Sequence, residues 1–263
     1  MLRPLLLTLA LALPAQAAPP RHIASLNLCA DQFLVALADP AQIAGLTRLS
    51  HLPNMSPIAV AAARFPTIDA SAESLLARQP DLILTGWPGQ GDAAVRSGLK
   101  ARVVVVPPAN NYGEIIAQVR LVAGAVGHPE RGEALIHRMD AELAAIPRTG
   151  RGRVAADYQR RGYLSGAGTL MDDMMRRVGL VNLATKLSLP ALSNLSLERF
   201  VAARPDFLIT GAGPARDLGS AMLDHPAIAD IPRLRLPSSL ADCGGPSFPR
   251  AVRVLSDQLR QKR

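Results

Sequence analysis

The chain contains one long internal repeat, and this repeat constrains its architecture more than any other feature. Residues 73–86, ESLLARQPDLILTG, are matched by residues 198–211, ERFVAARPDFLITG. The leading glutamates (198 − 73) and the prolines (205 − 80) of the two copies are both 125 residues apart. Solenoid repeats have periods of roughly 20–50 residues, so a repeat this long predicts two similar lobes. A cleft between two lobes is a preferred place for a small-molecule site.

Short apolar segments alternate with helix-forming segments along both halves of the chain. The expected strands are residues 22–26, 43–47, 81–85, 102–106, 153–158, 206–210 and 234–237. The expected helices are residues 31–38, 72–79, 92–100, 169–178, 197–203 and 246–260, and we expect loops at 159–168 and after Leu183. This alternation, with strands that are apolar throughout, predicts an α/β fold with mostly parallel sheets.

A helical region, residues 112–146, lies between the two halves and is interrupted at Gly127-His128-Pro129. Proline suits the first turn of a helix, so a second helix of about 18 residues is expected from Pro129, roughly 27 Å long. A single rigid helix between the lobes would restrict hinge motion. The predicted division is an N-terminal α/β lobe at 18–110, a helical linker at 111–150 and a C-terminal α/β lobe at 151–263.

Residues 1–17 have the pattern of a cleavable signal peptide. Arg3 is followed by a short apolar run and then by Ala15-Gln16-Ala17, a small-x-small cleavage site. The run is shorter than the roughly 20 residues needed to span a bilayer. We therefore expect cleavage after Ala17 and a soluble mature protein that is exported to an oxidising compartment. No cysteine stands at the cleavage site, which argues against a lipid anchor.

Cys29 and Cys243 are the only cysteines. An exported chain with two cysteines can form one disulfide, provided that their Cα atoms lie within about 7 Å. Two separate thiols near the cleft are the alternative, and the sequence leaves both interpretations open.

The formal net charge is +8, but the basic residues are scattered, with no run of five or six. Together with export, this argues against a nucleic-acid partner. The five histidines are dispersed, so no protein-built metal site is expected. The Gly89-Gln90-Gly91 turn lacks the acidic residue that a dinucleotide site requires about 20 positions later. We expect no cofactor.

Polar and aromatic residues follow the expected strands, where ligands of open α/β sheets bind. The candidate ligand contacts of the first half are Asn27, Cys29, His51, Trp87 and Tyr112, and those of the second half are Tyr158, Arg160, Arg161, Tyr163, Asp242 and Cys243. Aromatic rings with arginine donors suit a bulky ligand that carries negative charge or hydrogen-bond acceptors. Arg160 and Arg161 can also be read as a solvated loop.

Three segments resemble one family of proteins. These are residues 23–27 with 43–46, residues 73–84, and residues 163–168 with 172–182. In their order and content they are similar to the periplasmic substrate-binding proteins of iron-siderophore and cobalamin ABC importers. The resemblance implies two α/β lobes joined by one long helix, with a ligand in a shallow cleft. It also implies that Glu73 and Glu198 dock with arginines of a membrane permease, although an acid at a helix start is also favoured by the helix dipole.

The sequence therefore predicts a monomeric periplasmic receptor without enzymatic activity, which delivers a ferric siderophore to an ABC permease. A corrinoid (cobalamin) or haem ligand is the alternative within the same class. A secreted α/β hydrolase would need a nucleophile, a base and an orienting acid, and no motif supplies them. A sensory domain with an empty cleft is the third alternative.

Overall fold

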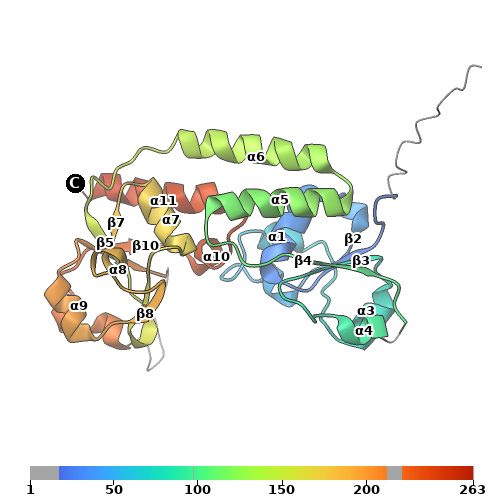
Figure 1. Ribbon diagram of the computed structural model, residues 1–263, viewed down its shortest axis with the longest axis horizontal. Coiled ribbons are helices and arrows are strands. Elements are labelled where there is room, and N and C mark those ends of the chain that lie inside the picture. The colour runs from blue at the N-terminus through green and yellow to red at the C-terminus, as the bar shows by residue number, and fades with distance from the viewer. Residues whose placement is uncertain (1–17, 97, 212–220, 263) are drawn as a thin grey trace, which may run out of the picture.

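The computed structural model describes residues 18–96, 98–211 and 221–262. Two α/β lobes lie side by side, and long helices cover one side of both (Figure 1). The signal-peptide prediction falls on residues 1–17, which lie outside the described residues. None of the described helices is long and apolar enough to cross a membrane.

The first lobe contains a four-stranded parallel sheet with the order β2-β1-β3-β4. Its strands are β1 (Ile23–Ser25), β2 (Ile43–Gly45), β3 (Leu82–Thr85) and β4 (Arg102–Val105). Its helices are α1 (Leu28–Leu37), α2 (Ala59–Ala62), α3 (Ala72–Arg78) and α4 (Asp92–Arg96), with short 3-10 turns η1 (Pro40–Gln42) and η2 (Arg48–His51).

The second lobe repeats this topology in a second parallel sheet, ordered β10-β9-β5-β7. Its strands are β5 (Val154–Asp157), β7 (Val181–Asn182), β9 (Phe207–Thr210) and β10 (Arg233–Arg235). Its helices are α7 (Leu170–Arg177), α8 (Leu183–Lys186), α9 (Leu197–Ala203), α10 (Ser238–Ala241) and α11 (Phe248–Gln261), with 3-10 turns η3 (Arg160–Gly162), η4 (Ala221–Asp224) and η5 (Pro226–Ile228). Strands β5, β7, β9 and β10 correspond to β1, β2, β3 and β4.

The two copies of the repeat also begin and end their helices with the same local contacts. The Ser71 and Ser196 side chains each cap a helix by accepting a hydrogen bond from the backbone N–H three residues later. Gln79 and Arg204 end these helices in the left-handed conformation, with φ of 46° and 45°. The helix end that the proline imposes therefore has the same geometry in both lobes.

The strands of the repeat are buried on both faces. Leu82 and Leu84 of β3 pack into a large core, whereas Ile83 between them packs into a smaller one. In β9, Phe207 and Ile209 pack into the same large core, and Leu208 joins a third cluster. Burial on both faces explains why these strands are continuously apolar.

Two antiparallel helices, α5 (Tyr112–Val126) and α6 (Pro129–Ala144), make the connection between the lobes. Gly127 ends α5 with φ of 89°, and a Cβ there would lie 2.5 Å from Cβ of Pro19. Helix α5 packs beside α1, and α6 returns toward α11 of the second lobe (Figure 1). The predicted second helix from Pro129 is thus present, two residues shorter than expected at its C-terminal end.

The large core is continuous from one lobe to the other. It includes Phe33 and Leu84 from the first lobe, and Leu234 and Phe248 from the second. At the junction Tyr112 stacks on Phe248, with ring centroids 5.5 Å apart. Shared packing of this kind holds the lobes in a fixed relation.

Two segments predicted as loops form strands. β6 (Tyr163–Ser165) and β8 (Leu192–Asn194) pair as an antiparallel ribbon. Three-residue strands with mixed polar and apolar residues give little periodic signal, and their pairing depends on tertiary contacts.

Candidate functional site

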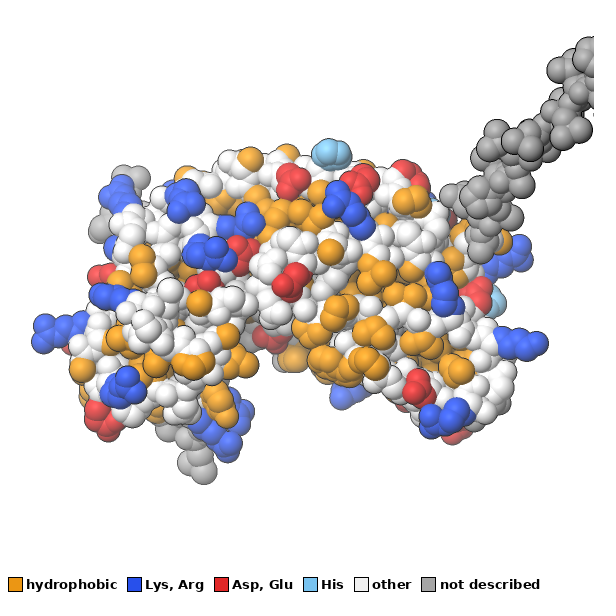
Figure 2. All heavy atoms as spheres, viewed as in Figure 1, with side chains coloured by type: hydrophobic (Ala, Val, Ile, Leu, Met, Phe, Trp, Pro, Cys, Tyr) orange, Lys and Arg blue, Asp and Glu red, His pale blue; other side chains and the backbone are white. Residues whose placement is uncertain are grey.

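The carboxyl ends of the two sheets meet at the junction of the lobes, where a disulfide joins Cys29 to Cys243. Cys29 follows β1 and Cys243 follows β10, and their Cα atoms are 5.3 Å apart. This finding excludes the alternative of two separate thiols. In the space-filling view the molecule is hollowed between the lobes, and hydrophobic side chains gather beside the hollow on the first lobe (Figure 2).

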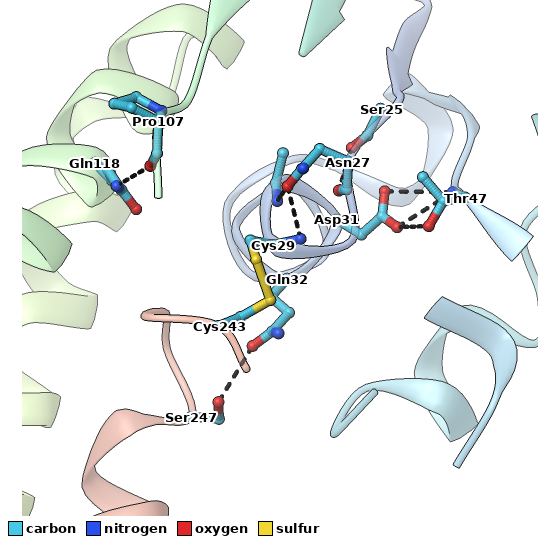
Figure 3. The surroundings of a disulfide bond; sticks show 11 residues. Ser25, Asn27, Cys29, Asp31, Gln32, Thr47, Pro107, Gln118, Cys243 and Ser247 are labelled. Carbon is cyan, nitrogen blue, oxygen red and sulfur yellow. Dashed lines mark hydrogen bonds between the residues drawn. A yellow bond between two sulfur atoms is a disulfide. The ribbon is translucent and has the colours of Figure 1, made fainter. Parts of the chain in front are cut away.

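Residues of both lobes lie around the disulfide, among them Gln32 of α1 and Ser247 (Figure 3). The Ser247 hydroxyl of the second lobe donates a hydrogen bond to Oε1 of Gln32 on α1, at 3.2 Å. A Cβ at Gly244 would lie 2.8 Å from Cβ of Ala109, so the close approach of the lobes requires a glycine there. The Asp242-Cys243-Gly244 turn is thus part of the contact between lobes.

Most predicted contacts of the first lobe have structural roles. Asn27 is the N-cap of α1, and its side chain accepts hydrogen bonds from the backbone N–H groups of Cys29 and Ala30. Each ring nitrogen of His51 lies 3.1 Å from a backbone carbonyl oxygen, so both are occupied within the protein. Trp87, by contrast, is 53% exposed in the turn after β3 and is free to meet a ligand.

Two predicted tyrosine contacts are core residues, and this corrects the sequence prediction. Tyr112 is buried, and its hydroxyl donates to Asp140 at 2.7 Å. Tyr158 is fully buried; its hydroxyl donates to the carbonyl oxygen of Leu195, and its ring stacks on Phe200. Burial raises the pKa of Tyr158 to about 12. Both phenol hydroxyls are therefore engaged within the protein, although Tyr158 is among the residues that line the cavity of the second lobe.

Other candidates remain on the surface of the second lobe. Tyr163 is 55% exposed on β6. Arg161 is exposed and has a φ of 59°, and its carbonyl oxygen accepts a hydrogen bond from the Asn194 side chain. Arg160 is exposed and has a partner within the chain. Cys243 is buried and Cys29 is half-buried in the disulfide.

A cavity of about 270 Å³ lies at the carboxyl ends of the second sheet. Its apolar lining includes Met171, Ile209 and Leu236, and its polar lining includes Asp157 and Asp242. Apolar walls with a few converging polar groups are typical of ligand sites, which usually measure about 300–1,000 Å³.

Two carboxyl groups of the cavity have perturbed acidity. Burial raises the pKa of Asp157, although hydrogen bonds from Ser165 (2.6 Å) and Gln159 (3.0 Å) oppose this effect. Burial also raises the pKa of Asp242. The hydroxyl of Thr210, which lines the same cavity, is buried and has no hydrogen-bond partner among the described residues. Perturbed acids in a cleft are typical of functional sites.

The two repeated glutamates occupy equivalent exposed positions. Glu73 lies in the first turn of α3 and Glu198 in the first turn of α9. Hydrogen bonds from its own backbone N–H and from the Ser196 hydroxyl lower the pKa of Glu198, which therefore stays ionised at neutral pH. Helices α3 and α9 lie in different lobes, on the side of the molecule opposite α5 and α6 (Figure 1).

The described part of the chain holds no group of three or more His, Cys, Asp or Glu side chains placed to bind a metal ion.

Asp31 is the acid of the first lobe whose pKa is shifted most strongly, and its side chain is buried beside Thr47. Its carboxylate accepts hydrogen bonds from the Thr47 hydroxyl at 2.5 Å and from the Thr47 backbone N–H. Burial raises the pKa of Asp31 to about 7.

A periplasmic binding protein family model matches residues 23–233, most of both lobes. The chain belongs to this family. No curated protein sequence matches the chain. The family assignment accounts for the repeated lobes and confirms the resemblance inferred from the sequence.

Solved structures of similar fold include several binding proteins for metal chelates. The periplasmic heme-binding protein RhuT from Roseiflexus sp. RS-1 is 24% identical, with a TM-score of 0.73 over 92% of this chain and 98% of that one. A periplasmic heme-binding protein from Pseudomonas aeruginosa is 21% identical, with a TM-score of 0.69 over 91% and 92%. The vitamin B12-binding protein BtuF of Vibrio cholerae is 17% identical, with a TM-score of 0.63 over 93% and 99%. At these identities the likeness shows the two-lobe fold.

Proposed function

We propose that this protein captures a bulky metal chelate in the periplasm and delivers it to an ABC permease. The cavity at the carboxyl ends of the second sheet, together with the hollow between the lobes, supports this proposal. A ferric siderophore is the first candidate, because exposed Trp87, Tyr163 and Arg161 offer aromatic surface and a cation near the strand ends. The protein acts by binding and release, without turnover.

Corrinoid or haem is the second candidate ligand. The observation that favours it is the fold: similar structures include binding proteins for haem and for vitamin B12. Both are flat macrocycles, larger than the 270 Å³ cavity, and would lie largely in the hollow between the lobes.

The test is titration of the mature protein with a ferric hydroxamate, cobalamin and haemin, followed by the fluorescence of Trp87. Trp87 is the only tryptophan, so its signal reports on one loop at the edge of the first sheet. We expect saturable quenching by one ligand at micromolar or lower concentration. Calorimetry with Trp87→Phe then measures how much of the affinity depends on the indole ring. A folded protein that binds none of the three would contradict the proposal.

Delivery would depend on Glu73 and Glu198. Two observations support this docking role. Both glutamates lie in the first turn of equivalent helices, α3 and α9, on the side of the molecule where the hollow opens. A shallow apolar groove that includes Leu197 and Val201 also lies beside Glu198. An ionised carboxylate flanked by apolar surface suits an arginine of a docking partner.

The variants Glu73→Arg and Glu198→Arg should abolish uptake of a radiolabelled chelate by cells while leaving ligand affinity unchanged. Glu130→Arg is the matched control, because Glu130 is also exposed in the first turn of a helix but lies on α6. Equal uptake by all three variants would refute a docking role. This outcome would leave ligand capture intact as a separate conclusion.

A further inference from the structure

The described lining of the second-lobe cavity carries more acidic than basic side chains. Among its described lining residues, Asp157 and Asp242 carry carboxyl groups, and Arg160 alone has a cationic side chain. Arg160 is already engaged within the chain. An incoming anionic group would therefore meet two acids and a cation that is shared with another partner.

Asp157 keeps part of its acceptor capacity unused. Both of its hydrogen bonds, from Ser165 and Gln159, go to Oδ2. Oδ1 receives no hydrogen bond from any described residue. A carboxylate has about four acceptor sites, so a buried one with two donors can accept more. Asp242 is exposed just after α10, and its carboxyl group likewise receives no hydrogen bond from the described residues.

These two acids come from different elements and line one space. Asp157 is the last residue of β5, and Asp242 follows α10. The buried hydroxyl of Thr210, at the end of β9, lines the same space without a partner among the described residues. The acceptors thus come from the ends of three elements and line one cavity. The rest of its lining is partly apolar, with Met171, Ile209 and Leu236, and partly polar, with Gln159, Arg160 and Ser238.

We propose that this cavity receives an arm of the chelate that ends in N–H donors, an amide or an ammonium group, and rejects an arm that ends in a carboxylate. This inference rests on the proposed chelate-binding function and narrows its ligand class. An N–H group would supply the donors that the two acids lack. Hydrogen bonds to charged acceptors are about twice as strong as neutral ones, whereas a carboxylate beside two acids is repelled.

The consequence differs between the candidate ligands. A corrinoid with amide side chains and a siderophore with a free amine both fit this cavity. Haem presents its two carboxylates at the ring edge, and these would have to point away from it. The exposed side chains of Tyr163 and Arg161, also on the second lobe, are compatible with all three ligands.

The test compares ligands that differ only in the end of one arm. Ferrioxamine B ends in an ammonium group, and its N-succinyl derivative ends in a carboxylate. Cobalamin has side-chain amides, and its monocarboxylic acid derivative replaces one of them. Calorimetry at pH 7 should show at least tenfold tighter binding of the donor-bearing member of whichever pair binds. Equal affinity, or tighter binding of the carboxylate member, would overturn the inference and leave chelate binding standing.

Variants connect the preference to the cavity. Asp242→Asn changes a carboxyl group that makes no hydrogen bond with the described residues, so the fold should be preserved. This variant should reduce the preference at least threefold. Asp157→Asn tests the second acid, with circular dichroism to check folding because Asp157 bonds Ser165. Asp69→Asn, on an exposed loop, is the matched control. A preference that survives both cavity variants, or no binding by any of the four ligands, would overturn the inference. If haemin is not bound either, the proposed function fails as well.

Discussion

Removing the disulfide between the lobes should destabilise the protein strongly. We choose the double variant Cys29→Ala with Cys243→Ala, because alanine adds no hydroxyl group to the buried site of Cys243. The bond closes a loop with a sequence separation of 214 residues. Loop closure of that length removes about 18 cal/mol/K of entropy from the unfolded chain, about 5 kcal/mol at 25 °C.

This magnitude predicts a large change in thermal stability. For a domain of roughly 150–250 residues, 1 kcal/mol corresponds to about 2–4 °C, so the melting temperature should fall by about 10–20 °C. The assay is thermal unfolding followed by far-ultraviolet circular dichroism, with and without reductant. Reductant should lower the melting temperature of the native sequence to a similar extent and leave that of the double variant unchanged.

The continuous core and the helix pair α5 and α6 hold the lobes together without the bond, so the double variant should still fold. A melting temperature within about 2 °C of that of the oxidised native protein would refute the reasoning. Such a result would mean that the unfolded chain gains no freedom when the cross-link is removed.

Three further predictions concern single side chains. Asn27→Ala removes the N-cap of α1 and should lower the free energy of unfolding in urea by about 0.5–2 kcal/mol; no loss would mean that the cap is redundant. Tyr158→Phe leaves the carbonyl of Leu195 without its donor and should cost about 1–3 kcal/mol in the same assay, whereas a loss of ligand affinity at unchanged stability would restore Tyr158 as a contact. The pKa of Asp31 is raised from 3.8 to about 7 in the folded state, so its stabilising contribution is complete below pH 4 and is lost as the pH rises to 7. Asp31→Asn should therefore lose less stability than the native protein over this range, and parallel pH profiles would contradict the assignment.

The repeat made most of the fold predictable from the sequence. Because a proline after a short apolar helix and before an apolar strand ends one element and begins the next, α3, β3, α9 and β9 were placed to within one residue. Helix α11 was predicted two residues early at its N-terminal end, where Ser247 precedes the first turn. The ribbon of β6 and β8 was missed, since its pairing joins short segments that show no alternation.

The site was less predictable, because tertiary packing decides which side chains are buried in the core and which face a cavity. The rule that ligands bind at strand ends selected Asp242, which lines the cavity of the second lobe, and Trp87, which is exposed in the turn after β3. The same rule selected Tyr112 and Tyr158, whose rings the structure buries in the core. Asp157 was missed, because a single carboxylate at the end of an apolar strand matches no binding motif. The one indication in the sequence was that an acid ends the otherwise apolar run VAAD, residues 154–157.

The shared core also limits whether either half of the chain could fold or evolve on its own. Although they repeat one plan, Phe33 and Leu234 belong to one continuous cluster, and α11 at the chain's end packs on α6 between them. Either half expressed alone would expose that apolar surface to water. A duplicated ancestor would have had a partner for that face, so the present halves are expected to be soluble only together. A chimera that takes one half from a relative would fold only if the core residues of the other half, which pack against it, were also replaced by those of the relative.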